Sequence, residues 1–207
     1  MRALVVVDIQ YDFCPGGTLA INHGDEVVPV INKVRGFFDK VIFTQDWHPP
    51  NHKSFASNNN KKVGDIIDLN GISQIMWPDH CVQNTKGAHL LESLTVRDND
   101  FIIHKGMDEE IDSYSTFFDN CRQNKTPLDD YLKAHHIKDI FMAGLATDYC
   151  VKFSVVDALE LGYNVTVIED AVRGVDLKPG DVDNAIHEMK EKGATFIHSD
   201  HIIQGSL

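Results

Sequence analysis

The chain has 207 residues, a formal net charge of -12 at pH 7 and 43% hydrophobic residues. This length and composition suit one well-packed domain, and we expect a single domain over residues 1–207. The acidic excess argues against nucleic acid as a partner. No segment approaches the roughly 18 apolar residues that a membrane helix requires. The N-terminus lacks the pattern of a signal peptide, so we expect a cytoplasmic protein that does not bind membranes.

Short apolar runs, several of them rich in β-branched residues, alternate with segments of helical periodicity along the chain. The runs predict strands at residues 3–7, 41–43, 101–103, 140–143, 165–168 and 195–197. The periodic segments predict helices at residues 26–38, 128–135, 151–161 and 183–192. Strands that alternate with helices predict an α/β fold, with an open, mainly parallel sheet of about six strands and helices on both faces.

Residues 47–86 interrupt this alternation. The segment contains Pro49, Pro50 and the dipeptide Trp77-Pro78, and it has little hydrophobic periodicity. Loops of this length inside a compact domain are usually functional or disordered. Because two histidine-bearing motifs lie within it, we predict that residues 47–86 are a functional, metal-bearing insertion.

Four polar side chains stand at or just after the ends of predicted strands: Asp8, Asp46, Lys105 and Cys150. Ligands of open α/β sheets bind beyond the carboxyl ends of the strands, so these residues are candidates for chemistry. Cys150 follows a strand and a tight turn and opens a helix, where the helix dipole favours a thiolate. Simple burial is the alternative for this cysteine, and for Cys14, Cys81 and Cys121 we expect packing roles.

Asp8 and Lys105 supply what a cysteine nucleophile needs. A partly desolvated aspartate can take the thiol proton and later return it, and a nearby lysine balances the negative charge. Each residue alone has a structural alternative, since Asp8 could cap a turn and Lys105 could extend to the surface. Their coincidence at strand ends with Cys150 predicts a catalytic Asp-Lys-Cys triad.

A metal site is indicated by Asp46 and His48, two residues apart at a strand end, and by further histidines at His52 and His80. Carboxylate oxygen and imidazole nitrogen suit Zn²⁺, Fe²⁺ or Mn²⁺. Cys81, beside His80, is a weaker candidate for a ligand.

Three segments resemble the signatures of the isochorismatase-like cysteine hydrolases, and in particular those of its nicotinamidase branch. They are residues 7–13 (Val-Asp-Ile-Gln-Tyr-Asp-Phe), 104–106 (His-Lys-Gly) and 144–151 (Gly-Leu-Ala-Thr-Asp-Tyr-Cys-Val). The resemblance extends from the first strand to about Ser199. It implies the triad Asp8, Lys105 and Cys150, acting through a thioester to convert nicotinamide to nicotinate and ammonia.

The resemblance also implies the remaining parts of the site. Asp46, His48 and His80 would bind one divalent ion, with Zn²⁺ preferred over Fe²⁺ or Mn²⁺ and with His52 as a candidate fourth ligand. A non-proline cis peptide before Ala146 would turn the amides of Ala146 and Cys150 toward one point as an oxyanion hole. The side chains expected around the aromatic amide are Phe13, Trp77 and Tyr149, while Tyr114 matches the family pattern with a structural role.

Two alternatives remain at this point. One is another amidohydrolase of the superfamily, acting on a carbamoyl or ureido substrate. The other is a catalytically idle metal-binding or thiol-sensing protein. The sequence leaves the oligomeric state open, including a homo-oligomer.

Overall fold

The computed structural model describes residues 1–206. Its centre is a six-stranded sheet in the order β5-β2-β1-β6-β7-β8, and every neighbouring pair is parallel. The strands are β1 (Arg2–Val7), β2 (Lys40–Asp46), β5 (Phe101–Lys105), β6 (Asp139–Leu145), β7 (Asn164–Arg173) and β8 (Thr195–Ile197). The predicted α/β fold with a six-stranded parallel sheet is confirmed.

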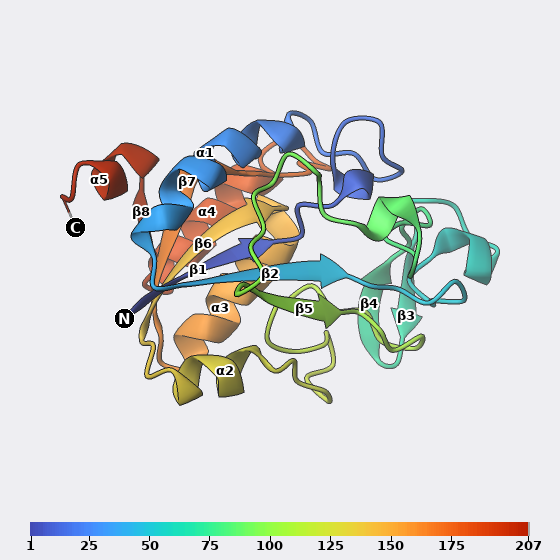
Figure 1. Cartoon of the computed structure of the whole chain (residues 1–207). Helices are drawn as coiled ribbons and strands as arrows, with labels where there is room; N and C mark the ends of the chain where they lie inside the picture. The colour runs from blue at the N-terminus through green and yellow to red at the C-terminus, as the bar shows by residue number, and fades with distance from the viewer. Residues whose placement is uncertain (207) are drawn as a thin grey trace.

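Helices cover both faces of this sheet (Figure 1). They are α1 (Val27–Val34), α2 (Leu128–Ala134), α3 (Lys152–Glu160), α4 (Asp181–Glu191) and α5 (Ser199–Ile203). One hydrophobic core lies between the sheet and α2, α3 and α4, and a second lies between the sheet and α1 and α5. Successive residues of β1 alternate between the two cores, as side chains of a strand buried on both faces must.

The four predicted helices and six predicted strands are all present, with ends that differ by a few residues. The largest difference is β7, which continues five residues beyond the predicted end to Arg173, past an irregularity in its pairing with β6. The short helix α5 was not predicted. Among the helices of residues 1–206, none combines the length and the hydropathy that a membrane span requires.

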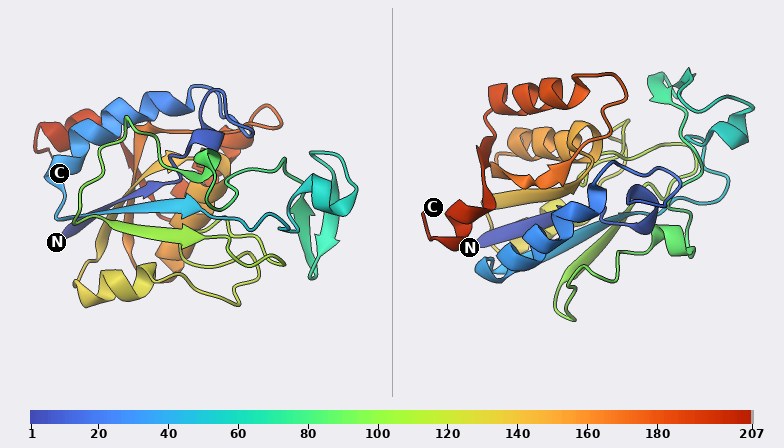
Figure 2. Two further views of the ribbon diagram at one scale, coloured as in Figure 1. Left: turned by 45° about the vertical axis from the view of Figure 1, so that its right-hand side comes forward. Right: turned by 90° about the horizontal axis from the view of Figure 1, so that it is seen from above.

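Residues 47–86 contain a two-stranded antiparallel sheet that was not predicted. It consists of β3 (Ile66–Leu69) and β4 (Ile72–Ile75), and it projects beyond the carboxyl ends of the large sheet (Figure 2). Asn70 and Gly71 join the strands, both with positive φ (56° and 82°). An Asn-Gly pair between apolar residues is a strong hairpin signal, so the sequence did contain the information for this element.

Candidate active site

Lys105 lies at the centre of a buried cluster of catalytic-type side chains. Its Nζ is 2.9 Å from Oδ2 of Asp8 and 3.4 Å from Sγ of Cys150. Asp8 follows β1, Lys105 is the last residue of β5, and Cys150 follows β6. These strands are not all neighbours, but they are parallel, so their carboxyl ends meet at one edge of the sheet. The predicted triad residues are therefore brought together.

Lys105 also contacts Asp46 and the backbone of the following loop. Its Nζ donates to Oδ1 of Asp46 and, at 2.8 Å, to the carbonyl oxygen of Ser113. The Lys105 side chain is fully buried, so the structural alternative of a lysine reaching the surface is wrong. Burial alone would lower the pKa of Lys105, but the carboxylates of Asp46 and Asp8 outweigh it and hold that pKa well above the usual range.

The pKa shifts of Asp8 and Cys150 are consistent with transfer of a proton between these two residues. Burial raises the pKa of Asp8, with Lys105 opposing and Asp46 adding to the rise. Burial also raises the pKa of the Cys150 thiol well above its usual range, again opposed by Lys105. The resting thiol is therefore neutral, and a carboxylate with a raised pKa is the better proton acceptor beside it.

The local backbone at Cys150 differs from a simple helix start. The peptide between Leu145 and Ala146 is cis, as the resemblance implied. Residues Thr147–Val151 then form a π-helical turn that leads into α3. Cys150 lies within this turn, two residues before α3, instead of on its first residue. Single π-helical turns are frequent at functional sites.

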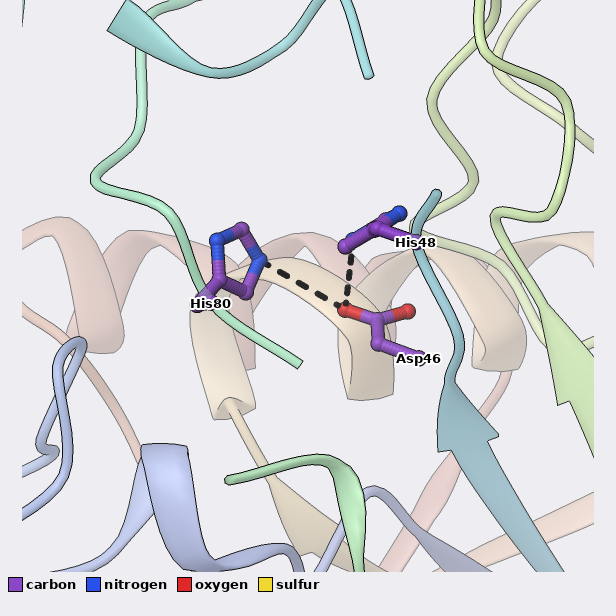
Figure 3. A group of neighbouring side chains, drawn as sticks. All are labelled: Asp46, His48 and His80. Atoms are coloured by element: carbon purple, nitrogen blue, oxygen red, sulfur yellow. Dashed lines mark ion pairs between the residues drawn. The ribbon is translucent and has the colours of Figure 1, made fainter. Parts of the chain in front are cut away.

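Asp46, His48 and His80 form a second group beside the triad (Figure 3). Each offers one ligand atom, and these atoms lie within 4.8 Å of one another. Oδ2 of Asp46 is 3.5 Å from Nε2 of His48 and 3.9 Å from Nε2 of His80. Asp46 thus faces the histidines with one oxygen and Lys105 with the other.

Hydrogen bonds set both histidines for metal binding. Nδ1 of His48 donates to the carbonyl of Gly106 (2.8 Å), and Nδ1 of His80 donates to the carbonyl of Pro78 (2.7 Å). The lone pair of each neutral ring is therefore on Nε2, the atom that faces Asp46. Nε2 of His48 is buried and has no hydrogen-bond partner within residues 1–206. Burial and the neighbouring His48 lower the pKa of His80 to about 4, which keeps it unprotonated at neutral pH. These residues fit a divalent ion.

His52 is buried in an adjoining group with His48 and Asp112. The Ser54 amide donates to Nδ1 of His52 (3.2 Å), an arrangement that puts the ring proton on Nε2. Burial and His48 lower the pKa of His52 to about 4. Because His48 belongs to both groups, His52 lies next to the group of Asp46, His48 and His80. The role of His52 as a metal ligand stays a prediction. Cys81 is fully buried in the core, and it is absent from the metal-type groups found within residues 1–206.

A cavity with about 390 Å³ of empty space connects the two groups. Its lining includes Cys150 and Ala146 near the triad, and Asp46 and His80 from the metal-type group. The predicted aromatic residues Phe13, Trp77 and Tyr149 also line it. Trp77 and Tyr149 meet edge to face, with ring centroids 5.2 Å apart. An aromatic and apolar lining with a few polar groups suits a flat aromatic ligand.

Several residues of the cavity were not predicted from the sequence: Leu19, Ile21, Asp112 and Val175. Leu19 and Ile21 belong to a segment without periodicity, and Asp112 and Val175 follow strands at a distance, so no local signal marked them. Tyr114 also lines the cavity. Its hydroxyl accepts hydrogen bonds from Nε1 of Trp77 (3.0 Å) and Nε2 of Gln74 (3.2 Å), a contact that positions the Trp77 ring.

An open parallel sheet that gathers a thiol, a carboxylate and an ammonium group at its carboxyl edge defines the class of an α/β cysteine hydrolase. The isochorismatase domain model matches residues 2–201, and the chain belongs to the isochorismatase family.

Nicotinamidases and pyrazinamidases are among the known proteins that this chain resembles in sequence and structure. The nicotinamidase of Escherichia coli K12 is 50% identical over 201 residues, which cover 94% of this chain and 93% of the relative. An Acinetobacter baumannii nicotinamidase/pyrazinamidase structure superposes with a TM-score of 0.94 at 42% identity and 97% coverage of both chains. A Pyrococcus horikoshii pyrazinamidase in complex with zinc superposes with a TM-score of 0.79 at 34% identity, covering 95% of this chain and 98% of that one.

Proposed function

We propose that the chain is a metal-dependent nicotinamidase that hydrolyses nicotinamide to nicotinate and ammonia, in the recycling of nicotinamide toward NAD. The observation that carries this proposal is a single cavity whose lining contains Cys150 together with Asp46 and His80. The high identity to nicotinamidases over nearly the whole chain supports the same reaction. Pyrazinamide, a related flat heteroaromatic amide, is expected as a second substrate.

In the first half-reaction, Asp8 takes the proton of Cys150, and the thiolate attacks the carboxamide carbon. The amides of Ala146 and Cys150 would hold the oxyanion of the tetrahedral intermediate. Asp8 then gives its proton to the departing nitrogen, which leaves as ammonia, and a thioester remains on Cys150.

In the second half-reaction, Asp8 takes a proton from water, which attacks the thioester carbonyl. The C–S bond breaks, the product leaves as nicotinic acid and ionises to nicotinate in water, and the thiolate of Cys150 recovers its proton from Asp8. Lys105 stays charged throughout, because two carboxylates and a transient thiolate surround its ammonium group.

Asp46, His48 and His80 would hold the ion. When bound, it supplies a Lewis acid for the pyridine nitrogen, directly or through a ligated water. Two imidazoles and one carboxylate favour Zn²⁺, with Fe²⁺ and Mn²⁺ as alternatives. Phe13 and Trp77 would enclose the ring, and Tyr149 would line the pocket next to the nucleophile. Fixing both ends of the substrate makes thiol attack effectively intramolecular.

Replacement of the nucleophile tests the reaction. We expect Cys150→Ala to abolish ammonia release from nicotinamide while metal content and the unfolding transition stay unchanged. Cys121→Ala is the matched control, because Cys121 is a partly exposed cysteine that does not line the cavity. Full activity of Cys150→Ala would refute the nucleophile.

Removal of the ion tests the metal requirement. We expect chelation to remove activity and added Zn²⁺, Fe²⁺ or Mn²⁺ to restore it, with metal analysis on the same sample. An undiminished rate after verified metal removal would contradict the proposed site.

The choice of substrate is tested by measuring ammonia release from a panel of nicotinamide, pyrazinamide and carbamoyl or ureido compounds. This panel separates a nicotinamidase from other amidohydrolases of the family.

A further inference from the structure

Two neighbouring strands each contribute one charged and one neutral polar side chain to the site. Asp8 and Gln10 follow β1, and Thr44 and Asp46 are at the end of β2. All four side chains are buried, with residue exposures of 0% for Asp8, Gln10 and Thr44 and 4% for Asp46. Buried polar groups must find partners within the protein, so their hydrogen bonds show which groups hold which.

Thr44 on β2 holds the carboxylate that follows β1. Its Oγ1 donates to Oδ1 of Asp8 at 2.6 Å and accepts from the Asp8 amide at 3.3 Å. One hydroxyl thus ties both the side chain and the backbone of Asp8, whose φ is 52°. The second oxygen, Oδ2, faces Lys105 and receives no directed hydrogen bond within residues 1–206. Thr44 therefore determines which oxygen of Asp8 is left to exchange a proton.

Gln10, which follows β1, makes hydrogen bonds to the backbone of Asp46, the last residue of β2. Its Oε1 accepts from the Asp46 amide, and its Nε2 donates to the Asp46 carbonyl, each at 2.8 Å. Nε2 also donates to the carbonyl of Ala88 at 2.8 Å. The backbone of Asp46 is therefore held on both sides by one side chain. This fixes the residue whose two oxygens divide between Lys105 and the histidines.

We propose that Thr44 and Gln10 are a reciprocal pair of positioning residues, with Thr44 orienting Asp8 for proton transfer and Gln10 orienting Asp46 for metal binding. The inference deepens the proposed function and rests on it. Neither residue touches the substrate or the ion in this scheme, and each acts through the carboxylate on the opposite strand. Separate losses are therefore expected from the two residues.

Thr44→Val removes the hydroxyl at nearly constant volume. We expect kcat for nicotinamide to fall about 10- to 100-fold, because small misplacements of a catalytic group have effects of this size. KM and metal affinity should stay unchanged, and Thr44→Ser, which keeps the hydroxyl, should recover most of kcat. Thr116→Val is the matched control, since the Thr116 hydroxyl is buried without a partner within residues 1–206. Its kcat should equal that of the wild type.

Gln10→Met removes all three hydrogen bonds at similar volume. We expect metal affinity, measured by competition with a chromophoric chelator, to fall about 10- to 100-fold, as for other residues that orient metal ligands. With saturating metal, most of kcat should return. Gln45→Met is the matched control, because Nε2 of Gln45 donates to the same Ala88 carbonyl at 2.7 Å but makes no hydrogen bond to Asp46. Its metal affinity should be that of the wild type.

The inference requires that Thr44→Val loses kcat without losing metal affinity, and that Gln10→Met loses metal affinity. A Thr44→Val enzyme with wild-type kcat, or a Gln10→Met protein with wild-type metal affinity, would overturn it. Equal losses of kcat and metal affinity in both variants would also overturn it, because they would indicate general loosening of the site. If either variant does not fold, Thr44→Ala, which also removes the hydroxyl, and Gln10→Glu carry the test. Gln10→Glu keeps the acceptor for the Asp46 amide and should show an intermediate metal affinity.

The proposed function is tested separately by these measurements. Absence of ammonia release from the wild-type protein would refute the nicotinamidase proposal alone. Metal affinity needs no substrate, so the part of the inference that concerns Gln10 can be decided even then.

Discussion

At the scale of single residues, the site depends on one ammonium group shared by two carboxylates and a thiol. Lys105 is the only cation paired with Asp8 and Asp46 in the salt bridges formed by lysines and arginines of residues 1–206. A buried ion pair contributes little net stability when it is complete, but breaking it by removing one partner is costly.

We therefore expect Lys105→Met to abolish activity and to lower the free energy of unfolding by about 3–5 kcal/mol, because two buried carboxylates lose their cation. Chemical denaturation checks this. Lys125→Met is the control, since Lys125 pairs with Asp130 in an exposed contact, where solvent screens the two charges. Similar losses in the two variants would contradict the central role of Lys105.

A second prediction at this scale concerns His52, whose pKa is lowered from 6.5 to about 4. Between pH 4 and pH 6.5 the unfolded chain binds more protons at His52 than the folded chain does. The contribution of His52 to the free energy of unfolding is therefore fully present above about pH 6.5 and is lost as the pH falls to about 4. In metal-free protein, we expect a smaller dependence of unfolding free energy on pH in His52→Gln than in the wild type. Denaturation at several pH values in the presence of a chelator measures both slopes, and equal slopes would contradict the lowered pKa.

At the scale of elements, the close approach of β1 and β6 places the strand ends that carry Asp8 and Cys150. Gly144, near the end of β6, allows the two strands to approach because it has no side chain. A Cβ at this position would lie 2.1 Å from the carbonyl oxygen of Val7, and the φ of Gly144 is 118°. Both the space and the backbone conformation therefore require glycine.

We expect Gly144→Ala to lower the free energy of unfolding clearly more than Gly162→Ala. Gly162 also has positive φ (85°), but nothing lies within 4 Å of its would-be Cβ. The control therefore measures only the conformational cost, about 1–2 kcal/mol. Equal losses in the two variants, measured by denaturation, would show that β1 and β6 can separate without consequence.

At the scale of the whole molecule, the metal-type group adds a link between segments that already meet through backbone hydrogen bonds, such as that from the His48 amide to the Cys81 carbonyl. Asp46 ends β2, His48 follows it, and His80 lies beyond the β3–β4 hairpin. A ligand that binds only the folded state stabilises it by mass action. An ion held by these three residues therefore stabilises the large sheet and residues 47–86 together.

We expect Zn²⁺ at about 100 times its dissociation constant to raise the free energy of unfolding by about 2.7 kcal/mol. Thermal unfolding with and without the ion measures the change. Asp46→Asn should lose most of it, and Asp79→Asn, whose side chain contacts Ser57, should retain it. An equal shift in both variants would place the ion elsewhere.

The parallel α/β fold and the candidates for the triad could be predicted from the order of residues along the chain. The alternation of strands and helices requires parallel strands, and their carboxyl ends meet at one edge whatever the details of packing, so Asp8, Asp46, Lys105 and Cys150 could be expected together. The assignment of residues 1–207 to one domain stays a prediction.

The way in which these side chains share their partners could be seen only in the folded chain. The two-sided contacts of Asp46, the placement of His52 beside Asp112, and the hydrogen bonds of Thr44 and Gln10 join residues up to 78 positions apart. Such contacts depend on strand register and side-chain direction, which leave no local pattern in the sequence. Chemistry at a strand end can therefore be predicted from the order of residues, whereas the orientation of each group requires the folded chain.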